Sequence, residues 1–540
     1  MCTQARSTPE PCTDGAIRGH PRGLYSLFFT EMWERMGYYG MRALLVLFMV
    51  DAPEAGGLGL RVENAAAVYG LFTAGVYLAA LPGGWFGDRV IGGRCAVWCG
   101  GVLISLGYLS LAIPERAMFY PALGLVVLGT GLLKPNITAM VGGLYGSGSG
   151  RRDAGFTIFY MGINLGAAIG PLICSTVAKW YGWRSGFGAA GLGMLVGLIQ
   201  YGLTNHLLGN VGRKTLDSVG GGVWWGWLSS GSTRAAVGSD CRVGRGWLRV
   251  VLLLLAVVAI AGVCYAVAGG AIRIDPVMAA GSAATVIIVI GALYFGCAFF
   301  VMGLTRAERR CVLAILVLFV ASAVFWAGFE QAGSSFNLFA QKHTDRVLEL
   351  LWMSGEARGA FEIPAGWFQS LGAIFVILFA PVVAWVWTAL ERRRIELDAS
   401  VKFGWGLILL AAGFAVMSAA SRYAAMGEPV SPLWLVLTYL LHSLGELCLS
   451  PVGLSSVTRL SPAKLVGQMV GVWFLATSLG NVLAGLIAGQ LKVETAERMP
   501  QGYLAIGLTA FCAGFVLILM AKPLSRLSAK EAGVAASERW

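Results

Sequence analysis

Four ionisable side chains lie in one long apolar stretch near the start of the chain. The stretch FTEMWERMGYYGMRALLVLF contains Glu31, Glu34, Arg35 and Arg42. At 100° per residue these four side chains and Tyr38 fall within about 140° of one helix face. A charge inside a membrane helix costs roughly 2.5–3.5 kcal/mol, so such residues persist where they pair or line a watery cavity. The pattern predicts a membrane helix whose polar face serves protons or a charged substrate.

Three further ionisable residues stand inside apolar stretches. They are Lys134 in LGTGLLKPNITAM, Glu330 in VFWAGFEQAGSSFNLFA and Glu446 in YLLHSLGELCLSPVGLS. The first half of the chain then holds three cations and two carboxylates, a sum of +1, and the second half two carboxylates, a sum of −2. Complementary charges orient a dipolar ligand. A substrate with a carboxylate at one end and an ammonium at the other matches this asymmetry.

Each charged site also has a structural interpretation. Glu34 and Arg35 can neutralise one another for packing alone, and Lys134 can extend to the interface if its span is displaced. Glu330 can be an interfacial charge near the end of its span, and Glu446 a carboxyl kept neutral in the core. We favour function for each of them. Several charges crowd one face of the first helix, Lys134 lies well inside its span, and Glu446 lies deep in its own.

Other side chains near these charges are weaker candidates. Trp326 lies one turn before Glu330, and Ser450 lies one turn after Glu446. Trp326 and Trp473 are either pocket walls or packing residues, and His442 is interpreted as a packing residue.

The whole chain has the composition of a multi-pass membrane protein. Of its 540 residues 57% are hydrophobic and 13% charged, and the mean hydropathy is +0.72. A soluble core does not need so many long apolar runs. Fourteen runs of about 20 residues, enough to span a bilayer, are predicted near 24–50, 65–87, 95–113, 118–142, 156–178, 183–207, 249–269, 277–304, 309–332, 367–390, 403–422, 431–454, 465–492 and 501–521.

The net charge of +12 does not indicate nucleic-acid binding. The basic residues sit in short loops between apolar runs, in alternate loops along the chain. This distribution predicts that these loops and both termini are cytoplasmic, in an inner-membrane protein. The basic loops contain Arg89, Arg94, Arg151, Arg152, Arg213, Lys214, Arg306, Arg309, Arg310, Arg392, Arg393, Arg394, Arg459 and Lys464.

The spans divide into two blocks of six. We predict an N-terminal tail (1–23), a six-helix bundle (24–208), a linker with two extra membrane helices (209–308), a second six-helix bundle (309–522) and a C-terminal tail (523–540). The extra pair carries few ionisable residues, which favours lipid-facing helices over pore lining. Trp224, Trp225 and Trp227 in the linker are interpreted as an interfacial anchor, with a partner-binding helix as the alternative. Two six-helix blocks suit a transporter whose site lies at the midplane between repeats.

Enzyme motifs are lacking in the sequence. There is no GxxxxGK[ST] loop for ATP and no HExxH. The four histidines are scattered without metal-ligand spacing. The eleven cysteines contain no CxxC pair and are expected to be reduced. The polar first 20 residues lack the apolar core of a cleaved signal peptide. We expect neither an enzyme nor a metal site.

The motifs together resemble those of the proton-dependent oligopeptide transporters, a branch of the major facilitator superfamily. EMWERMGYYGMR resembles the ExxERxxYYxxR signature of that family. GGWFGDRVIGGR, FTIFYMGINLG, FWAGFEQAGSS and GELCLSPVGLS resemble further motifs in the same order along the whole chain. The extra central helix pair is similar to that of the prokaryotic members. The resemblance implies an all-α membrane protein of the major facilitator fold, with two six-helix bundles and fourteen membrane helices.

The resemblance also implies roles for individual residues. Arg35, Arg42 and Lys134 would bind the peptide carboxylate, and Glu446 would bind the peptide amino terminus. Glu31 and Glu34 would pair with these three cations and pass the proton. Proton coupling would therefore involve Glu31, Glu34, Arg35 and Glu330. The pocket would be completed by Tyr38, Tyr39, Tyr77, Asn164, Trp326, Ser450 and Trp473.

One departure from the family pattern concerns the segment WFQSLGAIF. Gly372 and Ala373 stand where the family commonly has Asn-Pro. This puts in doubt an amide contact near the peptide amino terminus and the helix distortion that proline causes.

The expected function is proton-coupled import of di- and tripeptides across the inner membrane by alternating access. The expected partners are peptides, protons and the lipid bilayer, without nucleic acid and without a cofactor other than the coupling proton, and the unit is expected to be a monomer. Two alternatives remain: a proton-coupled carrier of another small solute, such as nitrate, an amino-acid derivative or a drug-like molecule, and a peptide sensor that does not transport.

Overall fold

The computed structural model describes residues 19–145, 150–213, 275–349, 360–394, 397–462, 465–491 and 498–523, with isolated positions 262, 266 and 493. The span predicted near 249–269, the three linker tryptophans, most of the N-terminal tail and nearly all of the C-terminal tail lie outside the described residues.

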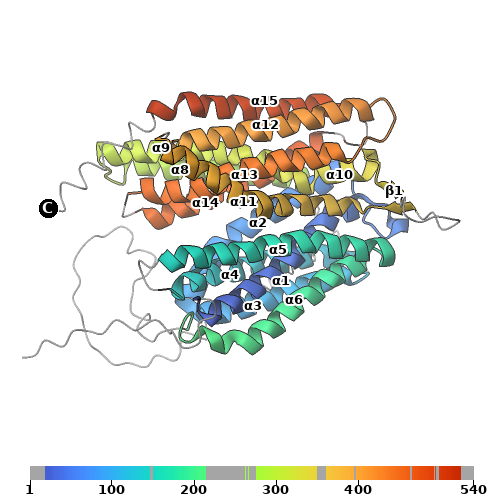
Figure 1. Ribbon diagram of the computed structural model, residues 1–540. Coiled ribbons are helices and arrows are strands. Elements are labelled where there is room, and N and C mark those ends of the chain that lie inside the picture. Colours follow the sequence, from blue (N-terminus) through green and yellow to red (C-terminus); the bar gives the residue numbers. More distant parts are fainter. Residues whose placement is uncertain are drawn as a thin grey trace, which may run out of the picture.

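Long helices make up the described chain (Figure 1). Because apolar runs of 20 or more residues must satisfy every backbone group internally in lipid, helices are the expected outcome. The first half contains α1 (Arg22–Val50), α2 (Val62–Phe86), α3 (Gly93–Ala112), α4 (Phe119–Gly143), α5 (Gly150–Tyr181) and α6 (Trp183–Thr204). A π-helical turn, η2 (Gly87–Ile91), continues α2, and short 3₁₀ turns are η1 (Pro53–Ala55), η3 (Arg116–Met118) and η4 (Asn205–Leu208).

The second half begins after the extra helix α8 (Pro276–Phe300). It contains α9 (Arg306–Phe329), α10 (Ser335–His343), α11 (Phe368–Arg392), α12 (Ala399–Ala424), α13 (Leu433–Leu460), α14 (Val466–Gln490) and α15 (Met499–Leu519). The 3₁₀ turn η7 (Glu330–Gly333) joins α9 to α10, and η8 (Ala365–Trp367) leads into α11. Strands β1 (Val347–Glu349) and β2 (Ala360–Glu362) pair antiparallel between α10 and α11. The hairpin and α10 were not predicted from the sequence.

Twelve helical segments in the described ranges are long and apolar enough to cross a membrane. To these we add α1, whose 29 residues include Glu31, Glu34, Arg35 and Arg42. The fourteenth predicted span is the one that lies outside the described residues. The predicted class, a predominantly helical multi-pass membrane protein, is therefore confirmed.

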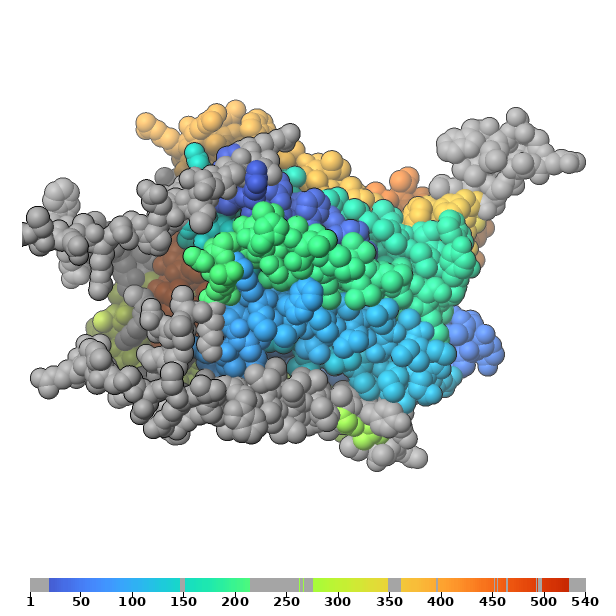
Figure 2. Space-filling model, turned by 90° about the horizontal axis from the view of Figure 1, so that it is seen from below, coloured from blue at the N-terminus to red at the C-terminus, as the bar shows by residue number. Residues whose placement is uncertain are grey.

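Apolar side chains cover the outside of the first half. The face formed by α3, α4 and α6 is seen in Figure 2, where blue and green mark these helices. It carries exposed Trp98, Leu106, Leu192, Ile199 and Leu203. So much contiguous apolar surface fits contact with lipid.

The helices pack as two bundles that lie one above the other in Figure 1. Within the first half α1 packs on α5 and α6, and α3 packs on α4; within the second half α12 packs on α13 and α15. Two helix pairs form most of the contact between the halves: α2 with α14, and α5 with α11. The helix α8 packs on both α2 and α14. It therefore lies across the seam, and its outer face exposes Met278 and Leu293.

Glycines allow α2 and α14 to touch backbone to backbone. A Cβ added to Gly70 would lie 2.9 Å from the Asn481 carbonyl oxygen, and one added to Gly485 would lie 2.4 Å from the Ala66 carbonyl oxygen. Larger side chains at these positions would force the two halves apart, because the contacting atoms belong to rigid backbone.

The β-hairpin fastens the two halves at one end of the molecule, here called the hairpin end. Lys179, in the last turn of α5, lies 3.4 Å from Glu362 Oε2 and also donates to the Glu362 carbonyl. Arg346 Nη2 lies 2.6 Å from Glu362 Oε1. Trp367 Nε1 donates to Thr176 Oγ1 of α5 at 3.0 Å. These polar contacts join α5 of the first half to the α10–α11 connection of the second.

We expect Lys179→Met to loosen the hairpin end. The pair is partly exposed, 30% and 48% for the two side chains, so its contribution falls in the range of about 0.2–1 kcal/mol. A free-energy change of that size alters the ratio of conformers with the hairpin end joined to conformers with it separated by about 1.4-fold to fivefold. Spin labels at Tyr181 and Leu433, which are exposed at this end, would report the change as a larger fraction of long distances between the two labels.

The control for this experiment is Arg61→Met. Arg61 pairs with Glu63 at 2.6 Å within the first half, so its removal should leave the distance distribution unchanged. An unchanged distribution for Lys179→Met as well would show that the hairpin pair does not hold the halves together.

Candidate functional site

The polar face of α1 holds a trio of buried charges. Arg35 Nε lies 3.2 Å from Glu31 Oε1 and also donates to Glu34 Oε2. All three residues are at most 3% exposed. Glu31 is one turn before Arg35, a spacing that places both on one face. Among the described residues, Arg35 is the one of the three predicted cations that pairs with these carboxylates.

The trio has unused hydrogen-bonding capacity. Glu31 Oε2, Glu34 Oε1 and Arg35 Nη2 have no hydrogen-bond partner in the part of the chain that the structure describes. Two carboxylates on one guanidinium carry a formal charge of −1, so one bound proton makes the trio neutral. Because an uncompensated buried charge is costly, this arrangement suits a site that exchanges a proton and offers Arg35 to an anion.

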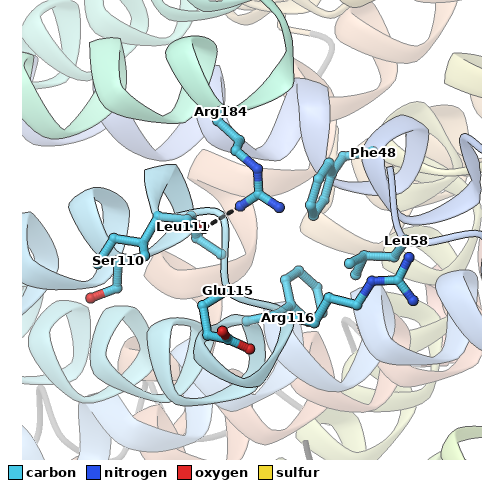
Figure 3. A pocket seen from close by; sticks show the side chains of 9 residues that line it. Phe48, Leu58, Ser110, Leu111, Glu115, Arg116 and Arg184 are labelled. Atoms are coloured by element: carbon cyan, nitrogen blue, oxygen red, sulfur yellow. Dashed lines mark hydrogen bonds between the residues drawn. The ribbon is translucent and has the colours of Figure 1, made fainter. Parts of the chain in front are cut away.

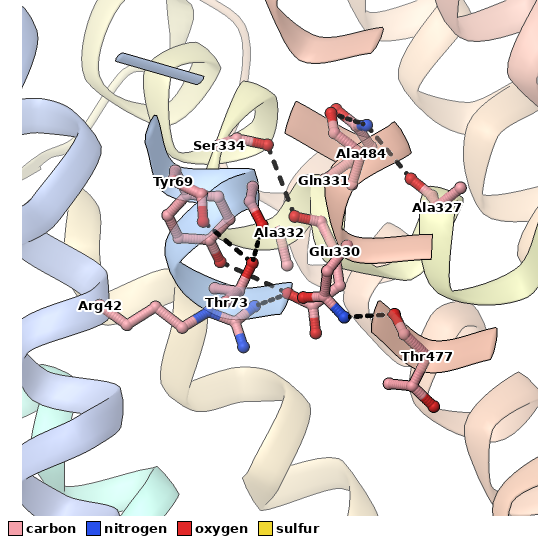
Figure 4. Close-up of polar contacts among 12 residues, drawn as sticks. Arg42, Tyr69, Thr73, Ala327, Glu330, Gln331, Ala332, Ser334, Thr477 and Ala484 are labelled. Carbon is pink, nitrogen blue, oxygen red and sulfur yellow. Dashed lines mark hydrogen bonds and ion pairs between the residues drawn. The ribbon is translucent and has the colours of Figure 1, made fainter. Parts of the chain in front are cut away.

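A second ion pair crosses between the halves. Arg42 Nη2 of α1 lies 2.7 Å from Glu330 Oε2, where η7 begins, and the two side chains are 7% and 3% exposed. Figure 4 shows both side chains pointing toward each other between the ribbons of the two halves. The interpretation of Glu330 as an interfacial charge is therefore wrong. Sequence reasoning assigned Arg42 to the substrate carboxylate and did not foresee its pairing with Glu330.

Lys134 on α4 packs against an aromatic ring. Its ammonium lies 4.6 Å from the centroid of Tyr77 of α2. Among the described residues no carboxylate lies within ion-pair distance of it, so the predicted pair with Glu31 or Glu34 is not formed in this structure. Its charge acts on Glu31 only at longer range. The ammonium is thus held by a cation–π contact and keeps its hydrogen-bond donors available.

Glu446 on α13 supplies the negative charge of the second half. It is partly buried, and within the described ranges it forms no ion pair. Its charge acts at longer range on Arg42, Glu330 and Tyr39. Ser450, one turn further along α13, has a buried hydroxyl without a partner among the described residues. A carboxylate without a cation is suited to an ammonium ligand.

The remaining predicted pocket residues fall into two groups. Tyr38, Tyr39 and Tyr77 lie beside the cations, since Arg35 lies over the Tyr38 ring and Arg42 lies 5.6 Å from the Tyr39 centroid. The others make contacts within their own half. Asn164 donates to the Tyr160 carbonyl, Trp326 stacks edge-on against Phe329, and Trp473 packs edge-on against Phe403.

The small residue Ala373 lies where α11 meets α5. It is buried against Ala167 and Ala168 of α5, and Tyr39 of α1 packs on the same cluster. Beside it, the Gly372 carbonyl accepts a hydrogen bond from Ser443 of α13 at 3.3 Å. Of the two positions at which the chain departs from the family pattern, Ala373 therefore lies in the contact between the halves, and Gly372 contacts α13 within the second half.

Tyr69 is a site residue that sequence reasoning missed. It lies on α2, fully buried, and its hydroxyl is 3.4 Å from Glu330 Oε2. The available signal was weak: a tyrosine two turns before Tyr77 in AVYGLFTAGVY.

Two cavities lie away from these residues. One, at the hairpin end of the first half, is large enough for a single water; there Arg184 donates to the Ile113 carbonyl (Figure 3). The other, of about 310 Å³, is lined by the GGWFGDRVIGGR segment, including Asp88, and by Asn136 and Arg213. Neither is lined by a predicted site residue. The described residues also contain no cluster of three His, Cys, Asp or Glu side chains that could hold a metal.

Two helical bundles with buried charges facing a shared seam define a membrane protein of the major facilitator class. Comparison with known proteins identifies the family within this class. The profile of the POT family (PTR2) matches residues 94–220 and 248–504. The peptide transporter YePEPT of Yersinia enterocolitica is 41% identical, over 94% of this chain and 95% of its own. A di-/tripeptide transporter of Lactococcus lactis subsp. cremoris is 33% identical, over 95% and 98%. The chain belongs to the POT family.

Solved structures agree with this assignment. The crystal structure of a peptide transporter POT in complex with sulfate superposes with a TM-score of 0.80, at 35% identity over 95% of this chain and 96% of that one. A POT family transporter in complex with 5-aminolevulinic acid gives 0.79, at 28% identity over 94% and 98%. The resemblance noted in the sequence and the predicted major facilitator fold are both confirmed.

Proposed function

We propose that this chain is a proton-coupled symporter that imports di- and tripeptides by alternating access. The observation that carries the proposal is the Arg42–Glu330 ion pair, which joins the two halves, while the net negative trio of Glu31, Glu34 and Arg35 lies about two to three turns away on α1. Binding of a proton and binding of a carboxylate both act on such pairs, so the two events are linked. Relatives that are named peptide transporters, at 41% and 33% identity, support the choice of substrate.

In the proposed cycle Arg35, Arg42 and Lys134 receive the peptide carboxylate, and Glu446 receives the ammonium. A proton on Glu330 neutralises the partner of Arg42, which frees the guanidinium for substrate and weakens the bond between the halves. The trio of Glu31, Glu34 and Arg35 passes through a neutral state when it binds a proton. A membrane potential of 100 mV contributes about 2.3 kcal/mol per charge moved inward, enough to concentrate a substrate.

We further propose an inner-membrane location with both termini in the cytoplasm and a monomeric unit. The basic loops support this orientation. The hairpin end then faces outward, where Lys179 and Glu362 join the two halves.

The test is uptake of a labelled dipeptide into proteoliposomes, with and without an inward proton gradient. The proposal predicts accumulation only with the gradient. Binding without uptake in either condition would favour a sensor. Failure to bind any peptide would favour a carrier of another solute.

Glu446→Gln should weaken recognition of the peptide amino terminus more than proton movement. Its carboxylate is partly buried and lacks a protein cation among the described residues, so a free ammonium is its natural partner. A lost charged hydrogen bond corresponds to roughly 10–100-fold in affinity. Competition by free and N-acetylated dipeptides measures it: acetylation should harm binding to the wild type and have little further effect in the variant.

Glu428→Gln, at an exposed position of the hairpin end, is the matched control and should bind both ligands as the wild type does. Equal competition by the two dipeptides in the wild type would contradict the role assigned to Glu446.

A further inference from the structure

Tyr69 and Arg42 converge on one oxygen atom. The Tyr69 hydroxyl donates to Glu330 Oε2 at 3.4 Å, and Arg42 Nη2 reaches the same oxygen at 2.7 Å. The Arg42 guanidinium also lies 5.6 Å from the centroid of the Tyr69 ring. Figure 4 shows that three separate segments meet at this carboxylate: α1, α2 and η7.

Gly333 provides the space for the tyrosine hydroxyl. A Cβ at position 333 would lie 1.8 Å from the Tyr69 oxygen and 3.0 Å from Arg42 Nε. Any other residue here would displace the hydroxyl from Glu330. Glycine at position 333 is thus required by the close approach of Tyr69 to η7.

Neighbouring contacts between helices fix the positions of Glu330 and Tyr69. Gln331 Nε2 of η7 donates to the Ala484 carbonyl of α14 at 3.0 Å and to the Ala327 carbonyl of α9 at 3.2 Å. The next residue on α14 is Gly485, whose backbone contacts Gly70, the residue after Tyr69. The contact between α2 and α14 therefore sets the separation between the tyrosine and Glu330.

We infer that Tyr69 is a positioning residue for the Arg42–Glu330 pair, acting through its hydroxyl in the space left by Gly333. The inference rests on the proposed proton coupling and deepens it. When Glu330 is ionised, Oε2 accepts from both Arg42 and Tyr69; when Glu330 carries the proton, that oxygen needs fewer donors. Tyr69 thus favours the ionised, locked state of the pair, and α2 takes part in deciding when the halves separate.

Other charged and titratable groups act on the same site and are kept constant in the experiment. They come from the helices α1, α2, α4 and α13 around Glu330: Arg42, Tyr38, Tyr39, Tyr77, Lys134 and Glu446. Tyr439 of α13 donates to the Ala332 carbonyl of η7. Tyr69→Phe changes none of them and retains the ring beside Arg42.

The experiment compares wild type, Tyr69→Phe, Gly333→Ala and the double variant. Proton-driven dipeptide uptake is measured against external pH. A carboxylate that loses a donor is protonated more readily, so the profile of Tyr69→Phe should move to higher pH by about one unit. Gly333→Ala should reduce uptake strongly by expelling the hydroxyl. Adding Tyr69→Phe should restore part of it, because the two effects act through one contact and are not additive.

A second measurement does not require transport. The infrared carbonyl band of protonated Glu330, identified by its loss in Glu330→Gln, is titrated in purified protein. Tyr69→Phe should shift its midpoint upward as well. Tyr201→Phe is the matched control, since Tyr201 is equally buried and donates to the Arg94 carbonyl at the same 3.4 Å.

The outcomes separate the two ideas. If the wild type transports no peptide but Tyr69→Phe shifts the titration midpoint of the Glu330 band, the proposed function is contradicted and the inference is supported. If Tyr69→Phe shows normal uptake, and neither the pH profile of uptake nor the titration midpoint of the Glu330 band is shifted, the inference is overturned and the proposed function stands. Should Gly333→Ala fail to fold, Tyr69→Phe alone decides.

Discussion

Replacing Glu34 with glutamine should abolish gradient-driven uptake of a dipeptide and leave exchange of one peptide for another at least partly intact. Glu34 is fully buried and shares Arg35 with Glu31. A glutamine still accepts a hydrogen bond from Arg35, so the packing of α1 is preserved. It cannot take up and release a proton, so the net cycle stops. Exchange requires only the loaded carrier to reorient.

The measurement pairs concentrative uptake with counterflow in the same proteoliposomes. Glu63→Gln is the control: Glu63 is also paired with an arginine, Arg61, but it is 38% exposed and lies at the hairpin end. It should behave as the wild type in both assays. Loss of exchange and binding together in Glu34→Gln would mean that the Glu34–Arg35 pair is structural.

Replacing Lys134 with alanine should reduce dipeptide uptake by roughly 10–100-fold, the equivalent of a lost charged hydrogen bond. Lys134 is held over Tyr77 and lacks a carboxylate partner among the described residues. Its ammonium is therefore free to bind the substrate carboxylate. Removal of an intramembrane charge favours insertion, so membrane expression should not fall. Lys134→Arg should restore uptake only in part, because a planar guanidinium does not replace a compact ammonium.

Lys402→Ala is the matched control for this variant. Its ammonium lies over the Trp387 ring at 5.1 Å, a comparable cation–π contact remote from the α1 charges. Uptake and membrane expression are measured for all three variants. Wild-type uptake by Lys134→Ala at normal expression would exclude Lys134 from the transport cycle.

The sequence determined the helices and part of the site. The length of the apolar runs predicted the spans, because only helices satisfy their backbone internally in lipid. The spacing of Glu31 and Arg35 placed both on one helix face, because residues four apart lie on the same side of a helix, and the structure pairs them there. The short helix α10 and the hairpin that follows it were missed, since neither has the length that marks a span.

The tertiary structure decided which distant charges meet. Arg42 was expected to bind the substrate carboxylate, yet it pairs with Glu330 of the other half. The Tyr69 hydroxyl donates to the same Glu330, which is 261 positions away in the sequence. Lys134 was expected beside a carboxylate and lies on Tyr77 instead. Periodicity shows which face of a helix carries a charge, but the partner depends on how closely two helices approach. Here that approach is set by glycine contacts such as those of Gly70, Gly333 and Gly485, whose effect exists only once the helices are packed.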